Sequence, residues 1–158
     1  AEPGTIAFMT APMDSRHGML TANDVTPYVF AAMPLGGEPH VIEVPAIGEK
    51  AQLFGSVLNA WQRPLVDVGP SGEDAGEGGR YLIVPPGYEG EIPSEGYIVV
   101  QSDTAAVHFS FRPVAINGGQ MADQSTYSQS VSVYPLADQT AKWPYIDVYE
   151  NPVNTLPV

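Results

Sequence analysis

Short runs of β-branched and aromatic residues follow one another along the chain, separated by breaks rich in glycine and proline. Sixteen glycines and sixteen prolines are spread over the 158 residues, and they leave few windows in which a helix could continue unbroken. Runs spaced roughly 8–14 residues apart are typical of an all-β protein, a two-sheet antiparallel sandwich or jelly roll. The predicted strands are Thr5–Thr10, Tyr28–Leu35, His40–Pro45, Ala51–Trp61, Leu65–Val68, Arg80–Val84, Tyr97–Gln101 and Ala105–Val114.

Alternation inside the runs predicts which face of each strand is buried. In the last run, Val107, Phe109 and Phe111 are expected to face the core, and the residues between them to face solvent or a groove. Apolar side chains occupy both faces of Ala51–Trp61, which predicts a central strand covered on both sides. We expect this strand to anchor the core.

Three segments depart from the strand pattern. The stretch Pro70–Gly79 is too polar and glycine-rich to pack, so we expect a mobile hairpin tip there. Met121–Gln129 is the best candidate for a helix. From residue 137 onward, prolines exclude regular structure while apolar residues remain frequent, which favours an extended segment across a surface. We therefore expect one β-sandwich over residues 1–136 and an extended proline-rich C-terminal segment over 137–158.

The chain is strongly acidic, and this limits its partners. Its formal net charge is -12, from 18 Asp and Glu against six Lys and Arg scattered along the sequence. Nucleic acid is not an expected partner, because phosphate binding needs clustered basic residues, and an anionic membrane surface would repel the chain. No run approaches the roughly 18 apolar residues of a membrane-spanning helix. The absence of cysteine excludes disulfides, a thiolate nucleophile and Cys-ligated metal sites.

Few polar residues show the spacing of a known catalytic or metal site. The histidines, His17, His40 and His108, are far apart and lack a metal spacing such as His-x-x-x-His, so a structural or solvated role is expected for each. The segment Phe54-Gly-Ser-Val-Leu58 lacks the second glycine of a serine-hydrolase elbow. With 18 carboxylates some chance pairing is almost certain, so paired acids give no signal for glycoside cleavage.

A glycine-rich stretch holds three acidic residues, Glu73, Asp74 and Glu77, whose oxygens could ligate calcium. Their spacing departs from the Asp-x-Asp-x-Asp-Gly pattern of calcium loops. A solvated hairpin tip is therefore the expected structure, and no cofactor is expected.

Several motifs, in order and with matching spacing, resemble those of one known family. They are Asn23-Asp-Val-Thr-Pro-Tyr28, Val41-Ile-Glu-Val-Pro45, Asn59-Ala-Trp61, Arg80-Tyr-Leu-Ile-Val-Pro-Pro-Gly-Tyr-Glu-Gly90, Val100-Gln-Ser-Asp-Thr104 and Arg112. Through them, the chain from Gly4 to Leu136 resembles the domain of unknown function family 1254.

The resemblance implies a fold and a setting but no agreed reaction. Members of the family are mostly β, and this domain usually precedes a second β-domain, family 1214, in one longer secreted or envelope-associated chain. The present sequence lacks that second domain and the partly helical stretch that precedes the first motif. We therefore expect a processed piece or a minimal member, secreted or located in the periplasm or cell envelope. The small-residue start, Ala-Glu-Pro-Gly, suits a chain left after signal cleavage and equally a processed fragment.

The residues that coincide with family motifs include Asp24, Tyr28, Trp61 and Arg112. Ordinary structural roles are open to them: turn capping for Asp24, core filling for Trp61, and pairing with a buried carboxylate for Arg112. The alternative is one pocket, catalytic or binding an anionic or sugar-like ligand, formed by four residues: Asp24, Tyr28, His108 and Arg112.

Three classes of function follow from these observations. In the leading one the domain is not an enzyme but binds a second β-domain chain, or assembles with copies of itself, through an exposed sheet face and the C-terminal segment. The second is a hydrolase or lyase acting on a polysaccharide or ester outside the cytoplasm, which needs a deep pocket with convergent polar groups. The third is a small-ligand or calcium-dependent carbohydrate-binding module, whose aromatic platform would lie near Trp61, Tyr88 or Tyr97.

Overall fold

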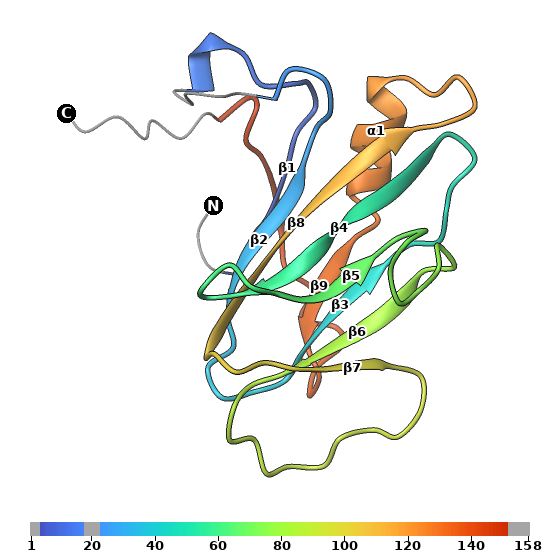
Figure 1. The fold of residues 1–158 in the computed structure, drawn as a ribbon. Helices are drawn as coiled ribbons and strands as arrows, with labels where there is room; N and C mark the ends of the chain where they lie inside the picture. The colour runs from blue at the N-terminus through green and yellow to red at the C-terminus, as the bar shows by residue number, and fades with distance from the viewer. Residues whose placement is uncertain (1–3, 18–22, 152–158) are drawn as a thin grey trace, which may run out of the picture.

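Two stacked β-sheets and one short helix make up the fold (Figure 1). A computed structural model describes residues 4–17 and 23–151. The order in the six-stranded sheet is β10 (Tyr145–Asp147), β1 (Ile6–Phe8), β2 (Val29–Pro34), β8 (Ala106–Ala115), β4 (Ala51–Asn59) and β5 (Pro64–Val68). The order in the four-stranded sheet is β7 (Ile98–Gln101), β6 (Gly79–Val84), β3 (His40–Val44) and β9 (Ser132–Pro135). A 3-10 turn spans Ser15–His17, and α1 (Met121–Ser128) lies beside β8 and β4 at one end of the sandwich.

The eight predicted strands, the predicted helix and the all-β sandwich are confirmed. Two strands, β9 and β10, were not predicted. The sheets are also mixed rather than purely antiparallel, because β10 runs parallel to β1 and β7 runs parallel to β6. Parallel neighbours need a long connection, which residues 85–97 supply between β6 and β7.

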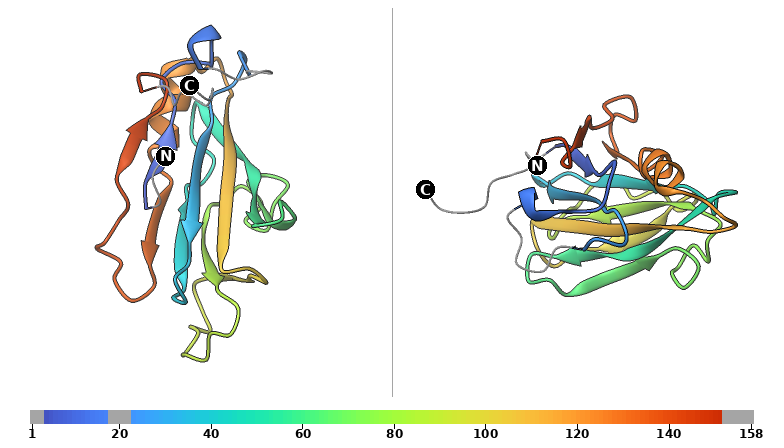
Figure 2. Two further views of the ribbon diagram at one scale, coloured as in Figure 1. Left: turned by 90° about the vertical axis from the view of Figure 1, so that its left-hand side faces the viewer. Right: turned by 90° about the horizontal axis from the view of Figure 1, so that it is seen from above.

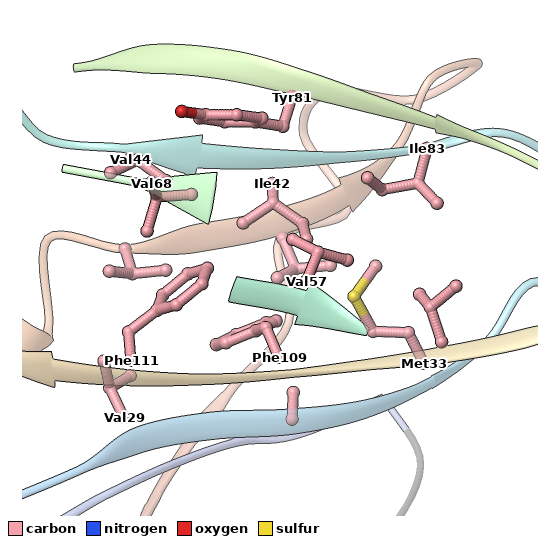
Figure 3. Close-up of a cluster of buried hydrophobic side chains, with 14 of the residues drawn as sticks. Val29, Met33, Ile42, Val44, Val57, Val68, Tyr81, Ile83, Phe109 and Phe111 are labelled. Atoms are coloured by element: carbon pink, nitrogen blue, oxygen red, sulfur yellow. The ribbon is translucent and has the colours of Figure 1, made fainter. Parts of the chain in front are cut away.

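The core fills the space between the inner faces of the two sheets (Figure 3). Val107, Phe109 and Phe111 on β8 are all buried, as the alternation predicted, and the ring centroids of the two phenylalanines lie 4.5 Å apart. Ile42 and Tyr81, from the four-stranded sheet, approach them from the other side. Each large apolar side chain buried in this way stabilises the fold by about 1.5–3 kcal/mol, so the inner face of β8 is a main source of stability.

The strand β4 has one covered face rather than two. Leu53 and Val57 point into the core and are buried, whereas Phe54 and Leu58 on the opposite face are half-buried. The prediction that both faces are covered is therefore wrong. Within the described residues there are only two sheets, and the second packs on the inner face of the first.

The C-terminal segment joins the edges of both sheets. The Trp143 N–H donates a hydrogen bond to the Val133 carbonyl of the four-stranded sheet at 2.9 Å, and the Pro144 carbonyl accepts one from the Ile6 N–H of the six-stranded sheet at 2.8 Å. Figure 2 (left view) shows the orange and red segments with β9 and β10 along the same side of the molecule. The expectation that prolines exclude regular structure here is wrong, because Pro144 lies just before β10 and takes part only through its carbonyl.

The two tryptophans give a test of this packing. Trp143 is half-buried against the core, with its ring centroid 5.8 Å from that of His40, whereas Trp61 is 82% exposed. We predict that Trp143→Ala lowers the free energy of unfolding by about 2 kcal/mol, because it removes contacts that hold the C-terminal segment, and that Trp61→Ala changes it by less than about 0.5 kcal/mol. Urea unfolding followed by circular dichroism measures both; equal losses in the two variants would contradict this assignment.

Candidate functional site

Two of the predicted site residues are in contact on the outer face of the six-stranded sheet. The guanidinium carbon of Arg112, on β8, lies 5.1 Å from the ring centroid of Tyr28, which immediately precedes β2. Asn23 Nδ2 donates a hydrogen bond to the Tyr28 hydroxyl at 3.0 Å, while Asn23 Oδ1 accepts from the N–H groups of Val25 and Thr26. The asparagine amide thus fixes both the turn and the phenol, and the cation lies over an aromatic ring of defined position.

The other two predicted site residues lie apart from this pair. His108 is half-buried on the same outer face, opposite Leu58 of β4. It precedes Arg112 by four residues and therefore lies roughly 13 Å away along the strand. Asp24 is exposed in the bend before β2. The structure brings Tyr28 and Arg112 together and places His108 farther along the same face, so a single pocket formed by all four residues stays a prediction.

Two cavities in the described part of the chain are lined by none of these four residues. One, of about 410 Å³, lies beside β5 and is lined by residues 64–67 and 71–73. The other, of about 290 Å³, lies between residues 48–51 and one side of α1. Both are open depressions. Neither offers the deep pocket with convergent polar groups that a hydrolase or lyase needs.

His17 is a buried polar residue that the sequence did not single out. It is 6% exposed, its ring stacks on that of Tyr149 with a centroid distance of 5.2 Å, and its Nδ1 lies 3.1 Å from Asp14 Oδ1. Its Nε2 is buried, and among the described residues it has no hydrogen-bond partner. The spacing of Asp14 and His17 was visible in the sequence, but the stacking on Tyr149, near the other end of the chain, was not.

The acidic loop between β5 and β6 packs around the Asp74 carboxylate. One oxygen accepts hydrogen bonds from the Gly69 N–H and the Tyr81 hydroxyl, both at 2.6 Å, and the other accepts from the Gly78 N–H at 3.2 Å. Burial, and after it the hydrogen bond to Asp74, raises the pKa of Tyr81 well above its ordinary value. The prediction of a mobile hairpin tip is therefore wrong. The polar loop packs because a buried carboxylate accepts hydrogen bonds from its backbone N–H groups and from a tyrosine hydroxyl.

The same geometry bears on the calcium hypothesis. Both oxygens of Asp74 already accept hydrogen bonds, while Glu73 and Glu77 are exposed. Residues 4–17 and 23–151 contain no group of three or more His, Asp or Glu side chains placed to hold a metal ion. Glu73, Asp74 and Glu77 thus do not converge on one site in this arrangement.

Of the three aromatic residues considered as a sugar platform, Trp61 presents its ring to solvent. It is 82% exposed, at the tip of the hairpin that joins β4 and β5. Tyr88 and Tyr97 are half-buried against the outer face of the four-stranded sheet, and the Arg80 guanidinium carbon lies 4.6 Å from the Tyr97 ring centroid. Trp61 is therefore the accessible member of the set.

These features define a mixed two-sheet β-sandwich with an ordered Arg112–Tyr28 pair on the outer face of the six-stranded sheet and an exposed tryptophan on a hairpin. Over residues 3–135 the chain matches the family described as protein of unknown function DUF1254, and it belongs to that family. The resemblance noted in the sequence is thereby confirmed, while the domain boundary expected at residue 136 stays a prediction. The search among curated proteins found no match.

Among solved structures, the chain is similar to the crystal structure of the VPA0106 protein from Vibrio parahaemolyticus, with a TM-score of 0.63 and 18% sequence identity. The similarity covers 89% of this chain and 32% of that one, so this chain spans about a third of the length of the Vibrio protein. At this identity the comparison shows a shared fold.

In the described residues, no helix combines the length and apolar character needed to cross a membrane.

The packed loop predicts that substitutions of two nearby acidic residues, Asp74 and Glu77, change the free energy of unfolding by different amounts. Asp74→Asn should lower the free energy of unfolding by about 1–3 kcal/mol, because one amide group cannot accept from all three donors that the carboxylate now satisfies. Glu77→Gln, at an exposed position in the same loop, should change it by less than about 0.5 kcal/mol. Urea denaturation of both variants measures the difference, and a similar small effect for the two would show that Asp74 does not organise the loop.

A half-buried tyrosine, Tyr127, predicts loss of stability in alkaline solution. Burial raises the pKa of Tyr127 from its ordinary value of 10.0 to about 12, and its hydroxyl donates a hydrogen bond to the Ala46 carbonyl at 2.8 Å. Because the folded state resists deprotonation, this contribution is complete below pH 10 and is lost as the pH rises toward about 12. In Tyr127→Phe, stability should fall less steeply over this range in urea titrations at successive pH values; a slope equal to that of the unmodified chain would argue against the assignment.

Proposed function

We propose that this domain functions in binding rather than in catalysis, and that it associates with a second β-domain or with copies of itself through the outer face of the six-stranded sheet. The observation that carries the proposal is the incomplete burial of apolar side chains at the middle of that face. Phe54 and Leu58 both point outward from β4, a strand with a neighbour on each side, and both are half-buried.

The neighbours of these side chains complete a mixed apolar and polar surface. On the neighbouring strand β8, Arg112 is the cross-strand partner of Phe54, and His108 is the partner of Leu58. On the other side of β4, toward the edge of the sheet, Ser56 donates a hydrogen bond to Asp67 at 2.5 Å. Aromatic residues and arginine are enriched in protein interfaces, where an apolar centre is surrounded by polar groups. This surface has that composition.

The Vibrio protein supports the idea of a partner. The fold described here accounts for 32% of that chain, so most of that protein consists of other segments that have no counterpart in this chain. A second β-domain would then cover the outer face, either on a separate chain or as another copy of this one. We place this association outside the cytoplasm or at the cell envelope, an inference that rests on the family resemblance alone.

The test is the mass of the native particle and its sensitivity to one substitution. Light scattering, coupled to mass spectrometry of everything that co-elutes, should show a particle heavier than the 16.8 kDa chain. Leu58→Lys should weaken the association at least about tenfold, because it buries a charge in the contact. Val25→Lys, at a position 76% exposed outside the sheet, is the matched control and should leave the mass unchanged.

Two results would defeat the proposal. One is a chain that runs alone at 16.8 kDa at every concentration with nothing co-eluting. The other is an assembly that Leu58→Lys leaves intact while the variant remains folded by circular dichroism.

A further inference from the structure

Side-chain hydrogen bonds hold the backbone of the hairpin that carries Trp61 at three N–H groups. The Asn59 side chain, which is 1% exposed, accepts hydrogen bonds through Oδ1 from the N–H groups of Trp61 and Arg63, both at 3.0 Å. The Ala60 N–H donates to Thr104 Oγ1 at 3.1 Å, which ties the turn to the loop between β7 and β8. Gln62 is held at a φ of 62°, a conformation that costs free energy in a non-glycine residue.

The same hairpin carries a fixed polar pair, because Arg63 follows Trp61 by two residues and Asp103 is bonded to Asn59, the residue that also accepts from the Trp61 N–H. Asn59 Nδ2 donates to Asp103 Oδ1 at 2.8 Å, and the Arg63 guanidinium forms an ion pair with the same carboxylate. The hydrogen bond from Asn59, together with the Arg63 charge, lowers the pKa of Asp103, so the carboxylate stays ionised. The side chains of Arg63 and Asp103 remain 65% and 49% exposed, so both keep donors and acceptors that can reach a ligand.

We propose that Trp61, Arg63 and Asp103 form a binding site for neutral carbohydrate, in which a pyranose ring stacks on the indole and its hydroxyls bond to the ion pair. The axial C–H groups of a pyranose carry partial positive charge and match the negative face of an aromatic ring. A sugar hydroxyl can donate to a carboxylate and accept from a guanidinium at once. Because the hairpin backbone is already hydrogen-bonded, little backbone conformational entropy is lost on binding.

The surroundings favour a sugar over a protein partner at this point. The residues of the turn next to Trp61 in the sequence, Ala60, Gln62 and Arg63, are small or polar, and all three are exposed. A protein that covered the whole hairpin would remove water from the exposed Arg63–Asp103 pair, which is costly. A sugar leaves the pair open to water. The net charge of -12 further disfavours anionic polysaccharides, so the ligand is expected to be neutral.

The test uses neutral hexasaccharides of β-1,4-linked glucose, xylose and N-acetylglucosamine, with a uronate hexasaccharide as the anionic comparison, each titrated calorimetrically into the full chain. At least one neutral sugar should bind at millimolar concentration or below. Trp61→Ala should weaken that binding at least about tenfold, and Asp103→Asn should weaken it to a smaller extent. Val25→Ala, at another highly exposed apolar position, should leave it unchanged.

The outcomes separate this site from the proposed partner surface. Leu58→Lys, which targets the outer face of the sheet, should leave sugar binding unchanged, and Trp61→Ala should leave the particle mass unchanged. The carbohydrate site is overturned if no neutral sugar of the panel binds, or if Trp61→Ala binds as tightly as the unmodified chain. It is equally overturned if Trp61→Ala dissociates an assembly while no sugar binds, because the indole would then be a protein contact.

Discussion

The fold depends on the burial of one face of β8 against the four-stranded sheet. Phe109 and Phe111 stack on each other at the centre of the core, and β8 pairs with β2 on one side and β4 on the other. Its inner residues therefore determine which faces of its two neighbours are buried, because cross-strand partners share a face. The same register turns His108 and Arg112 outward, so the residues that could serve binding are positioned by the packing of the residues between them.

The outer surfaces of the two sheets are covered unequally. On the four-stranded sheet, Tyr88, Tyr97 and Leu136 pack over a second buried cluster. On the six-stranded sheet, Met9 and Val148 form a third buried cluster near β1 and β2. The outer face of β8 and β4 is left only half-covered. Its apolar side chains lie together on this face, and a protein interface explains that grouping better than the scattered apolar residues found on any protein surface.

Much of the fold could be predicted from the sequence, because eight strands carry their own signal in β-branched residues and turn punctuation. What could not be predicted depends on distant contacts. β10 is three residues long and exists because Pro144 and Trp143 find partners on both sheets, contacts that no local pattern contains. The sequence of the loop around Asp74 does not predict that it packs, because one partner that stabilises its carboxylate, Tyr81, lies on the next strand. For the site, motif positions identified Tyr28 and Arg112, but not the contact between buried His17 and half-exposed Asp14.

Asp74 and Asn59 show how this chain builds ordered loops without helices, disulfides or apolar packing. In each case one buried polar side chain accepts hydrogen bonds from two backbone N–H groups, and these bonds offset the cost of removing the side chain from water. At Asp74 the result is a closed loop with buried groups. At Asn59 the same kind of hydrogen bonding holds a turn whose large aromatic side chain, Trp61, is exposed to water. A loop whose only role was to connect two strands would not need that arrangement, because a shorter polar turn would join β4 to β5 without exposing an indole. The cost of keeping Trp61 exposed on a fixed backbone is therefore best explained by a ligand that uses the ring.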